Sequence, residues 1–196
     1  MKVLVGFEFS ATVREAFKAK GHDAWSCDIL DTEVPGNHYK CDIQIALTDK
    51  FWDLIILHTP CTRVALCGNS TYGKGMPKHE ERIEAIKWTE HIWNIAFYNC
   101  EKVAYENPKN VMGKYIGKRT QAIQPYEFGH PERKETWLWL KGLPQLVETN
   151  NVYDQMMALP KNVRERLHYM SPGKNRGHER SRTFQGIANA MAEQWG

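Results

Sequence analysis

The chain has 196 residues, of which 42% are hydrophobic and 25% are charged, and its net charge is +3. This length and composition are those of one domain spanning residues 1–196, and the charge permits a polyanionic partner without requiring one. No apolar run is long enough to span a membrane, and the first residues turn polar too soon for a signal peptide. Five cysteines without regular spacing predict free thiols and a cytoplasmic location.

The first predicted elements are a strand, a helix and a second strand, which together make a βαβ unit. Residues 2–6 form the buried first strand, and Ser10 is the expected N-cap of a helix that ends at Gly21. Residues 23–27 form the second strand, which ends at Asp28. Folds of this kind hold a ribose with an acid at that place, although an aspartate there is equally typical of a turn.

The next two predicted strands also end in polar residues. After a loop, residues 38–41 form a weak third strand that ends at Asp42. Residues 52–57 form the fourth strand. The uninterrupted apolar run at its centre predicts that this strand is buried on both faces, as in a parallel sheet.

Cys61 follows the central strand after a forced turn. Pro60 cannot donate a hydrogen bond to a strand ladder, so the strand stops before it. The thiol is then presented at the carboxyl end of the strand, the edge where ligands bind in open α/β sheets. The alternative is that Cys61 is a small buried residue, as most free cysteines are.

The second half of the chain begins with a polar segment over residues 62–78, whose three glycines predict a mobile lid or a binding loop. A long helix over residues 78–99 follows, and then a fifth strand over residues 102–105 that ends before Glu106. The remaining predicted elements are a terminal hairpin (124–128 and 136–140), a short helix (161–167) and an amphipathic helix (184–195). The predicted fold class is therefore α/β, with a mostly parallel sheet and a terminal antiparallel hairpin.

Four acidic or nucleophilic side chains follow the predicted strands. Because the carboxyl ends of parallel strands share one edge, we expect these side chains to face one crevice: Asp28, Asp42, Cys61 and Glu106. A thiol and a carboxyl in one pocket suit electrophilic substitution of a pyrimidine. The thiolate adds to C6, a carboxylic acid bonded at N3 and the exocyclic amine absorbs the developing charge, and C5 becomes nucleophilic.

Five short motifs occur in order along nearly the whole chain. Thr59-Pro60-Cys61 is similar to Pro-Pro-Cys, and Tyr105-Glu106-Asn107-Pro108 is similar to a motif Glu-Asn-Val. Residues 5–11 occupy the place of a Gly-rich cofactor loop. Residues 128–134 are similar to a segment with the motif Gln-x-Arg-x-Arg, and residues 186–190 are similar to the motif Gly-Asn-Ala-Val. Together they resemble the cytosine-C5 DNA methyltransferase family, especially its small phage and prophage members.

The resemblance implies a Rossmann-like, S-adenosylmethionine-dependent methyltransferase fold, without a metal. It implies transfer of a methyl group from S-adenosylmethionine to C5 of cytosine in DNA, in the bacterial host cytoplasm if the gene is carried by a phage. Cys61 is the implied nucleophile and Glu106 the implied carboxyl on the cytosine edge. The implied cofactor-binding residues are Gly6, Phe7, Glu8, Ser10, Asp28, Asp42, Pro60 and Asn189. The implied substrate-binding residues are Arg63, Asn107, Arg133 and Lys134, together with the segment 62–78.

The sequence departs from the family pattern in several places. Only Gly6 remains of several cofactor-loop glycines, and Thr59 replaces the first proline. Glu132, Lys134 and Thr136 occupy the Gln-x-Arg-x-Arg positions, with Arg133 as a neighbouring substitute. About 40 residues follow the hairpin before the last helix, too few for a target-recognition domain. We therefore expect DNA binding with little sequence selectivity, helped by basic residues that gather over 102–119 and 161–182.

Two other functions stay open at this point. One is a non-catalytic nucleic-acid-binding protein that keeps the methyltransferase fold. The other is an enzyme that modifies C5 of pyrimidines in free nucleotides, which would explain the missing recognition domain. A zinc site made of His58, Cys61 and Cys67 is disfavoured, because the spacing matches no common structural site and a fourth ligand is missing.

Overall fold

The computed structural model describes residues 1–173 and 176–196, and its centre is one seven-stranded sheet. The strand order across the described sheet is β3-β2-β1-β4-β5-β7-β6. The strands are β1 (Lys2–Gly6), β2 (Asp23–Asp28), β3 (His38–Lys40), β4 (Leu54–Leu57), β5 (Val103–Pro108), β6 (Gln121–Ile123) and β7 (Thr136–Lys141). The five strands from β3 to β5 are parallel, whereas β7 runs antiparallel to β5 and to β6. The α/β class, with a mostly parallel sheet and an antiparallel end, is confirmed.

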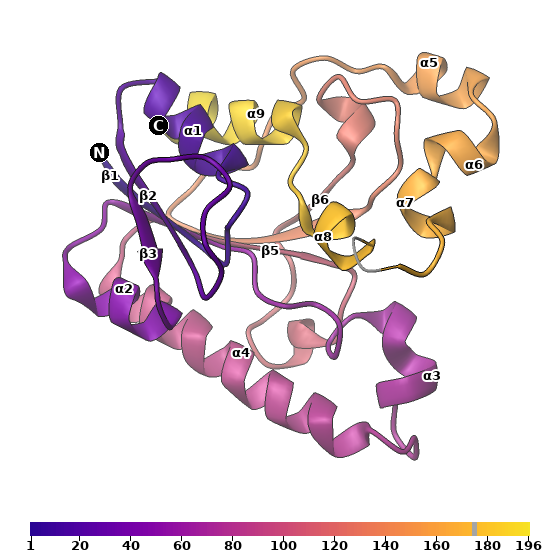
Figure 1. The fold of residues 1–196 in the computed structure, drawn as a ribbon, viewed down its shortest axis with the longest axis horizontal. Helices are drawn as coiled ribbons and strands as arrows, with labels where there is room; N and C mark the ends of the chain where they lie inside the picture. The colour runs from indigo at the N-terminus through magenta and orange to yellow at the C-terminus, as the bar shows by residue number, and fades with distance from the viewer. Residues whose placement is uncertain (174–175) are drawn as a thin grey trace.

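Helices cover both faces of the sheet (Figure 1). On one face lie α1 (Thr12–Ala19) and α9 (Gln185–Trp195), and on the other lie α2 (Ile43–Asp49) and α4 (His79–Asn99). Alternate residues of β4 enter the two cores: Leu54 and Ile56 face the first pair, Ile55 and Leu57 the second. This double burial is the reason that β4 reads as an unbroken apolar run. In the described part of the chain, no helix is long and apolar enough to cross a membrane.

Several short elements differ from the sequence predictions. Segment 62–78 is partly helical, with η1 (Leu66–Gly68) and α3 (Asn69–Tyr72), and α2 was not predicted. The hairpin begins at Gln121, three residues before its predicted start, and η3 (Pro125–Glu127) follows β6. The helix predicted over residues 161–167 is instead two short helices, α6 (Lys161–Arg164) and α7 (Arg166–Tyr169). The remaining short helices are η2 (Met112–Lys114), α5 (Tyr153–Ala158) and α8 (Arg176–Ser181). Helices of one or two turns carry too little periodicity to be recognised in a sequence.

The start of α1 also differs from the prediction that Ser10 is its N-cap. Phe7 and Ala11 both have positive φ angles, 63° and 62°, and Ala11 occupies the N-cap position. These turns place the Glu8 carboxylate over the helix start. There it accepts the backbone N–H groups of Val13 and Arg14 at 2.6 and 3.1 Å. Glu8 therefore does the capping, from outside the helix.

A fully buried arginine on α1 holds the loop between β2 and β3. The guanidinium of Arg14 donates to the Val34 carbonyl at 2.6 Å, the Asn37 carbonyl at 3.3 Å and the Ser26 hydroxyl at 3.1 Å. A charged donor group that has lost its water must be satisfied inside the protein, and here loop carbonyls do so. Arg14 thus helps to fix the conformation of the loop over residues 32–37.

We predict that Arg14→Met lowers the free energy of unfolding by about 2–4 kcal/mol, because the loop carbonyls lose their charged donor. Lys18→Met, on the exposed side of the same helix, is the matched control and should change it by less than about 0.5 kcal/mol. Denaturant titration followed by circular dichroism measures both values. Equal, small losses in the two variants would show that water replaces Arg14 without cost.

Candidate active site

The carboxyl ends of β1 and β4 form a topological switch point at one edge of the sheet. β1 lies between β2 and β4, so the chain leaves the neighbouring ends of β1 and β4 toward opposite sides of the sheet. Ligands bind at such a switch point in open α/β sheets. The segments that border it are residues 7–11 after β1 and residues 58–61 after β4.

His58 and Glu106 meet at this edge. Parallel pairing of β4 with β5 ends at Leu57 and Tyr105, so His58 and Glu106 are the next residues of the two strands. The ring Nδ1 of His58 lies 3.1 Å from Oε2 of Glu106. Glu106 is inside β5 rather than after it, because β7 pairs antiparallel with β5 as far as Pro108. The predicted end of this strand was therefore too early.

The His58 contact and the charge of Lys134 lower the pKa of the Glu106 carboxyl. Burial alone raises its pKa, but the hydrogen bond and charge of His58 and the charge of Lys134 outweigh burial. The net result is a pKa below the ordinary glutamate value. Lys134 is itself buried, which lowers the pKa of its ammonium group, while Glu106 and Cys61 oppose that shift. The pocket thus contains a compensated set of charges.

The Cys61 thiol lies within the electrostatic reach of this set. Burial raises its pKa, the charge of Glu106 raises it further, and the charge of Lys134 lowers it. The net pKa is above that of an ordinary cysteine, so Cys61 is a thiol at neutral pH. Cys61, Glu106 and Lys134 therefore lie within electrostatic range of one another, and the sequence predicted that Cys61 and Glu106 share one edge of the sheet. The protons, however, are distributed in the opposite way from an activated cysteine.

Asn107 fixes the turn that carries Cys61. Its amide Nδ2 donates to the Thr59 carbonyl at 2.8 Å, and its Oδ1 accepts a hydrogen bond from Asn110 at 3.0 Å. The Thr59 hydroxyl also donates to the Tyr105 hydroxyl at 3.3 Å. Because Asn107 is only 1% exposed and its amide is used inside the protein, it positions the Cys61 turn rather than facing a substrate.

The segment after Cys61 is anchored, which disagrees with a freely mobile lid. The Arg82 guanidinium of α4 donates to the carbonyls of Arg63 and Ala65 at 2.6 and 3.0 Å, and to the Asn69 side chain at 2.7 Å. The side chain of Arg63 is exposed and forms an ion pair with Glu81 at 3.0 Å. The sequence did not indicate this role of Arg82, because the pattern of a helix does not distinguish a buried arginine from a solvent-exposed one.

Arg133 and Lys134 point to different places. The Lys134 ammonium donates to the Arg182 carbonyl at 3.0 Å beside the Glu106 pocket. The Arg133 side chain is exposed, and its Nη2 lies 3.7 Å from the sulfur of Met157 in α5. Of these two predicted substrate contacts, the structure brings only Lys134 to Cys61.

Four predicted cofactor residues lie in the loop after β1. Gly6 is required by packing, since a Cβ there would lie 2.7 Å from Ile43. The Phe7 ring packs edge-on against Trp88 at 5.4 Å, Glu8 caps α1, and Ser10 is buried. The positive φ angles of Phe7 and Ala11 are those that glycine adopts without strain. The loop therefore makes glycine-type turns without the glycines, and such strain is typical of functional loops.

Two predicted acids take part in local turns. Oδ1 of Asp28 accepts the backbone N–H of Leu30 at 2.9 Å, and Oδ1 of Asp42 accepts that of Gln44 at 2.8 Å as the N-cap of α2. These contacts use one oxygen of each carboxylate. Beside Asp28, the side chain of Ile29 is 75% exposed, which is unusual for isoleucine. This apolar surface was missed in the sequence.

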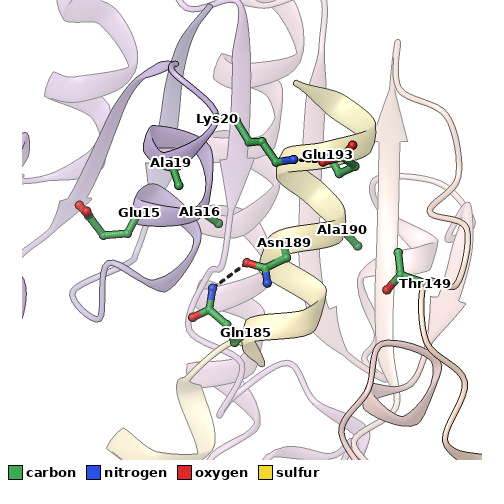
Figure 2. Close-up of a pocket in the computed structure, with 9 residues that line it drawn as sticks. All are labelled: Glu15, Ala16, Ala19, Lys20, Thr149, Gln185, Asn189, Ala190 and Glu193. Carbon is green, nitrogen blue, oxygen red and sulfur yellow. Dashed lines mark hydrogen bonds and ion pairs between the residues drawn. The ribbon is translucent and has the colours of Figure 1, made fainter.

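Asn189 lies outside the crevice. Figure 2 shows it in a groove between α1 and α9, where its Oδ1 accepts a hydrogen bond from Gln185 at 2.8 Å. Lys20 and Glu193 form an ion pair at the far end of this groove. Pro60, in contrast, is exposed directly before Cys61. The structure therefore places Pro60 at the predicted site, whereas Asn189 faces the groove on the helical surface.

His58 is the main residue that the sequence reading undervalued. Besides bonding Glu106, it lies close enough to Glu8 to lower the pKa of that buried carboxyl, although burial still raises it overall. Nε2 of His58 is buried and, among the described residues, has no hydrogen-bond partner. The sequence contained a signal for this contact. His58 directly follows a predicted parallel strand, and a residue in that place lies next to the residue at the same level of the neighbouring strand, here Glu106.

Comparison with protein-family models gave no match, and no curated protein matches the sequence significantly. The geometry at the carboxyl edge therefore carries the functional assignment.

We predict opposite effects of two pocket variants on the pKa of Cys61. Glu106→Gln removes a negative charge and should lower it, whereas Lys134→Met removes a positive charge and should raise it. A shift of half a pKa unit changes the thiolate fraction about threefold. The rate of iodoacetamide labelling of Cys61, measured between about pH 7 and 10 by peptide mass spectrometry, reports these shifts. Cys67, which is exposed, serves as an internal control in the same digests. Rates that move in the same direction in both variants would point to altered access instead of charge.

Proposed function

We propose that this protein transfers a methyl group from S-adenosylmethionine to C5 of cytosine in DNA, through a covalent adduct on Cys61. The observation that carries the proposal is that Cys61, at the carboxyl end of β4, lies within electrostatic range of Glu106 on β5 and of Lys134. The arrangement of the sheet supports it, since a mostly parallel sheet with an antiparallel end is expected of the Rossmann-like methyltransferase fold. The five motifs resembling the cytosine-C5 family lie on this framework in the expected order.

The chain supplies the groups that such a reaction needs. The Cys61 thiolate forms a bond to C6 of cytosine, which moves electron density to C5. Glu106 in its protonated form donates to N3 and stabilises the adduct. After methylation, loss of the C5 proton to a base breaks the S–C6 bond and releases Cys61 as a thiolate. Bound S-adenosylmethionine supplies the electrophilic methyl group.

The proton distribution of the free protein differs from this requirement. Glu106 has a lowered pKa, and Cys61 has a raised one. A proton must therefore leave Cys61 and one must reach Glu106 when cytosine enters. His58 is the direct neighbour of Glu106, so it is placed to pass a proton to the carboxyl. The protein thus stays unreactive until substrate binds.

The residues at the β1–β2 side of the crevice fit a nucleoside cofactor. Asp28 accepts a backbone N–H with one oxygen, which leaves the second available for the ribose hydroxyls. The exposed side chain of Ile29 offers an apolar face to a purine ring. The turns at Phe7 and Ala11 bring the loop backbone to the same side.

We predict that DNA containing 5-fluorocytosine traps a covalent adduct on Cys61 when S-adenosylmethionine is present. Fluorine at C5 blocks the final elimination, so the S–C6 bond persists. Cys61→Ser should abolish the adduct and methyl transfer while leaving the fold intact, because a hydroxyl is a far weaker nucleophile at neutral pH. Denaturing gels and peptide mass spectrometry detect the adduct and its site.

Cys67→Ser is the matched control and should form the adduct at the normal rate, since Cys67 is an exposed thiol six residues away in η1. An adduct mapped to Cys67, or full activity of Cys61→Ser, would exclude this mechanism. If the wild-type protein binds DNA but neither binds S-adenosylmethionine nor forms an adduct, the non-catalytic function becomes the correct one.

A further inference from the structure

The loop between β5 and β6 carries an uninterrupted positive charge. From residue 107 to residue 126 the sequence has no acidic residue. The four basic side chains of this stretch are exposed, and none belongs to an ion pair within the described residues: Lys109, Lys114, Lys118 and Arg119. Unpaired, exposed cations in one loop attract a polyanion rather than stabilise the fold.

This loop is tied to the segment that carries Cys61. The Leu66 backbone N–H donates to the Lys109 carbonyl at 2.9 Å, and the Val111 N–H donates to the Val64 carbonyl at 3.1 Å. Between these bonds, the buried side chain of Asn110 accepts the Met112 N–H at 2.8 Å. The Lys109 end of the loop is therefore fixed relative to the segment after Cys61.

Two of the cations lie against one aromatic ring. The Arg119 guanidinium lies 4.2 Å from the centre of the Trp137 ring, and the Lys109 ammonium lies 5.9 Å from it. Glu135 is the carboxylate beside this group, where it accepts the indole N–H of Trp137 at 2.6 Å. The side chain of Tyr115, in the same loop, is 44% exposed. Cations interleaved with aromatic rings are typical of surfaces that bind nucleic acids.

An open hollow of about 520 Å³ lies at the end of this loop, lined by Lys118, Arg119, Gln121 and Trp137 among others. Its size is in the range of small-ligand sites, and cationic and aromatic side chains form its wall. Two of the predicted substrate-binding cations have other partners. Arg63 pairs with Glu81, and Lys134 is held in the Glu106 pocket.

We propose that the β5–β6 loop is a phosphate-binding track for a nucleic-acid strand, formed by Lys109, Lys114, Lys118 and Arg119. Lys109 is bonded through its carbonyl to the segment after Cys61, and both Lys109 and Arg119 lie against the Trp137 ring. That the bound strand presents its cytosine to Cys61 rests on the proposed function, whereas binding to the loop does not. A polymeric substrate, rather than a free nucleotide, follows from the track, because four separated cations exceed the phosphates of one mononucleotide.

The test is equilibrium binding of a fluorescent single-stranded oligonucleotide and of a duplex, without S-adenosylmethionine, at several salt concentrations. Each phosphate contact contributes about 0.7 to the salt slope for a single strand and about 0.9 for a duplex. Lys118→Gln/Arg119→Gln should therefore reduce the slope by about 1.4 for a single strand and weaken its binding about 25-fold at 0.1 M salt. A reduction of about 1.4 for the single strand, or of about 1.8 for the duplex, identifies the form of nucleic acid that the track fits.

Lys18→Gln/Lys20→Gln is the control, because it removes the same net charge from two exposed lysines at the end of α1, outside the β5–β6 loop. It should retain the wild-type slope, and circular dichroism should show that both variants fold. Equal weakening by the two pairs would overturn the proposal, since net charge alone would then explain binding. Polyglutamate that competes as well as the oligonucleotide would also overturn it. Binding that persists in Cys61→Ser, with methyl transfer lost, would support the track and the proposed function separately.

Discussion

The hydrogen bond from the Asn107 amide to the Thr59 carbonyl is the constraint on which the candidate site depends. It joins β5 to the turn after β4, and therefore fixes Cys61 relative to Glu106 on the neighbouring strand. The Oδ1 of the same side chain accepts a hydrogen bond from Asn110 in the basic loop, and that loop is hydrogen-bonded to the segment after Cys61. The Cys61 turn, the strand that carries Glu106 and the start of the basic loop are thus joined through the buried Asn107 side chain.

The charged groups around Glu106 offset one another, so their burial has no large free-energy cost. A lone buried carboxylate or ammonium is unfavourable, but here Glu106 lies between His58 and Lys134, and each shifts the pKa of the carboxyl downward. The consequence is that Cys61 stays protonated in the free protein. In the proposed reaction, the proton on Cys61 must therefore leave before the sulfur can attack.

The carboxyl edge divides into regions with separate tasks. Residues 7–11 and Asp28 border the β1–β2 side, where α8 also lies: its His178 ring stacks on Phe9 at 4.9 Å and contacts Glu33. Cys61 and Glu106 occupy the middle, at β4 and β5. The basic loop continues from β5 toward β6 and β7. A cofactor, a reacting base and a strand of phosphates would therefore lie in this order along one edge.

The sequence by itself determined the α/β class, the buried strand β4, the long helix α4, and the presence of Cys61 and Glu106 at one sheet edge. These features follow from local patterns, since periodicity and strand ends are written in neighbouring residues. Only the tertiary structure decided which polar residues are used internally. Glu8 rather than Ser10 caps α1, Arg14 and Arg82 hold loops, Asn107 is buried, and Asn189 faces the α1–α9 groove. The hydrogen-bond partners of these residues are distant in sequence, and so are the charges that shift the pKa values of Cys61 and Glu106. The sequence alone could not show them, because hydrogen bonding and burial depend on neighbours that only the fold brings together.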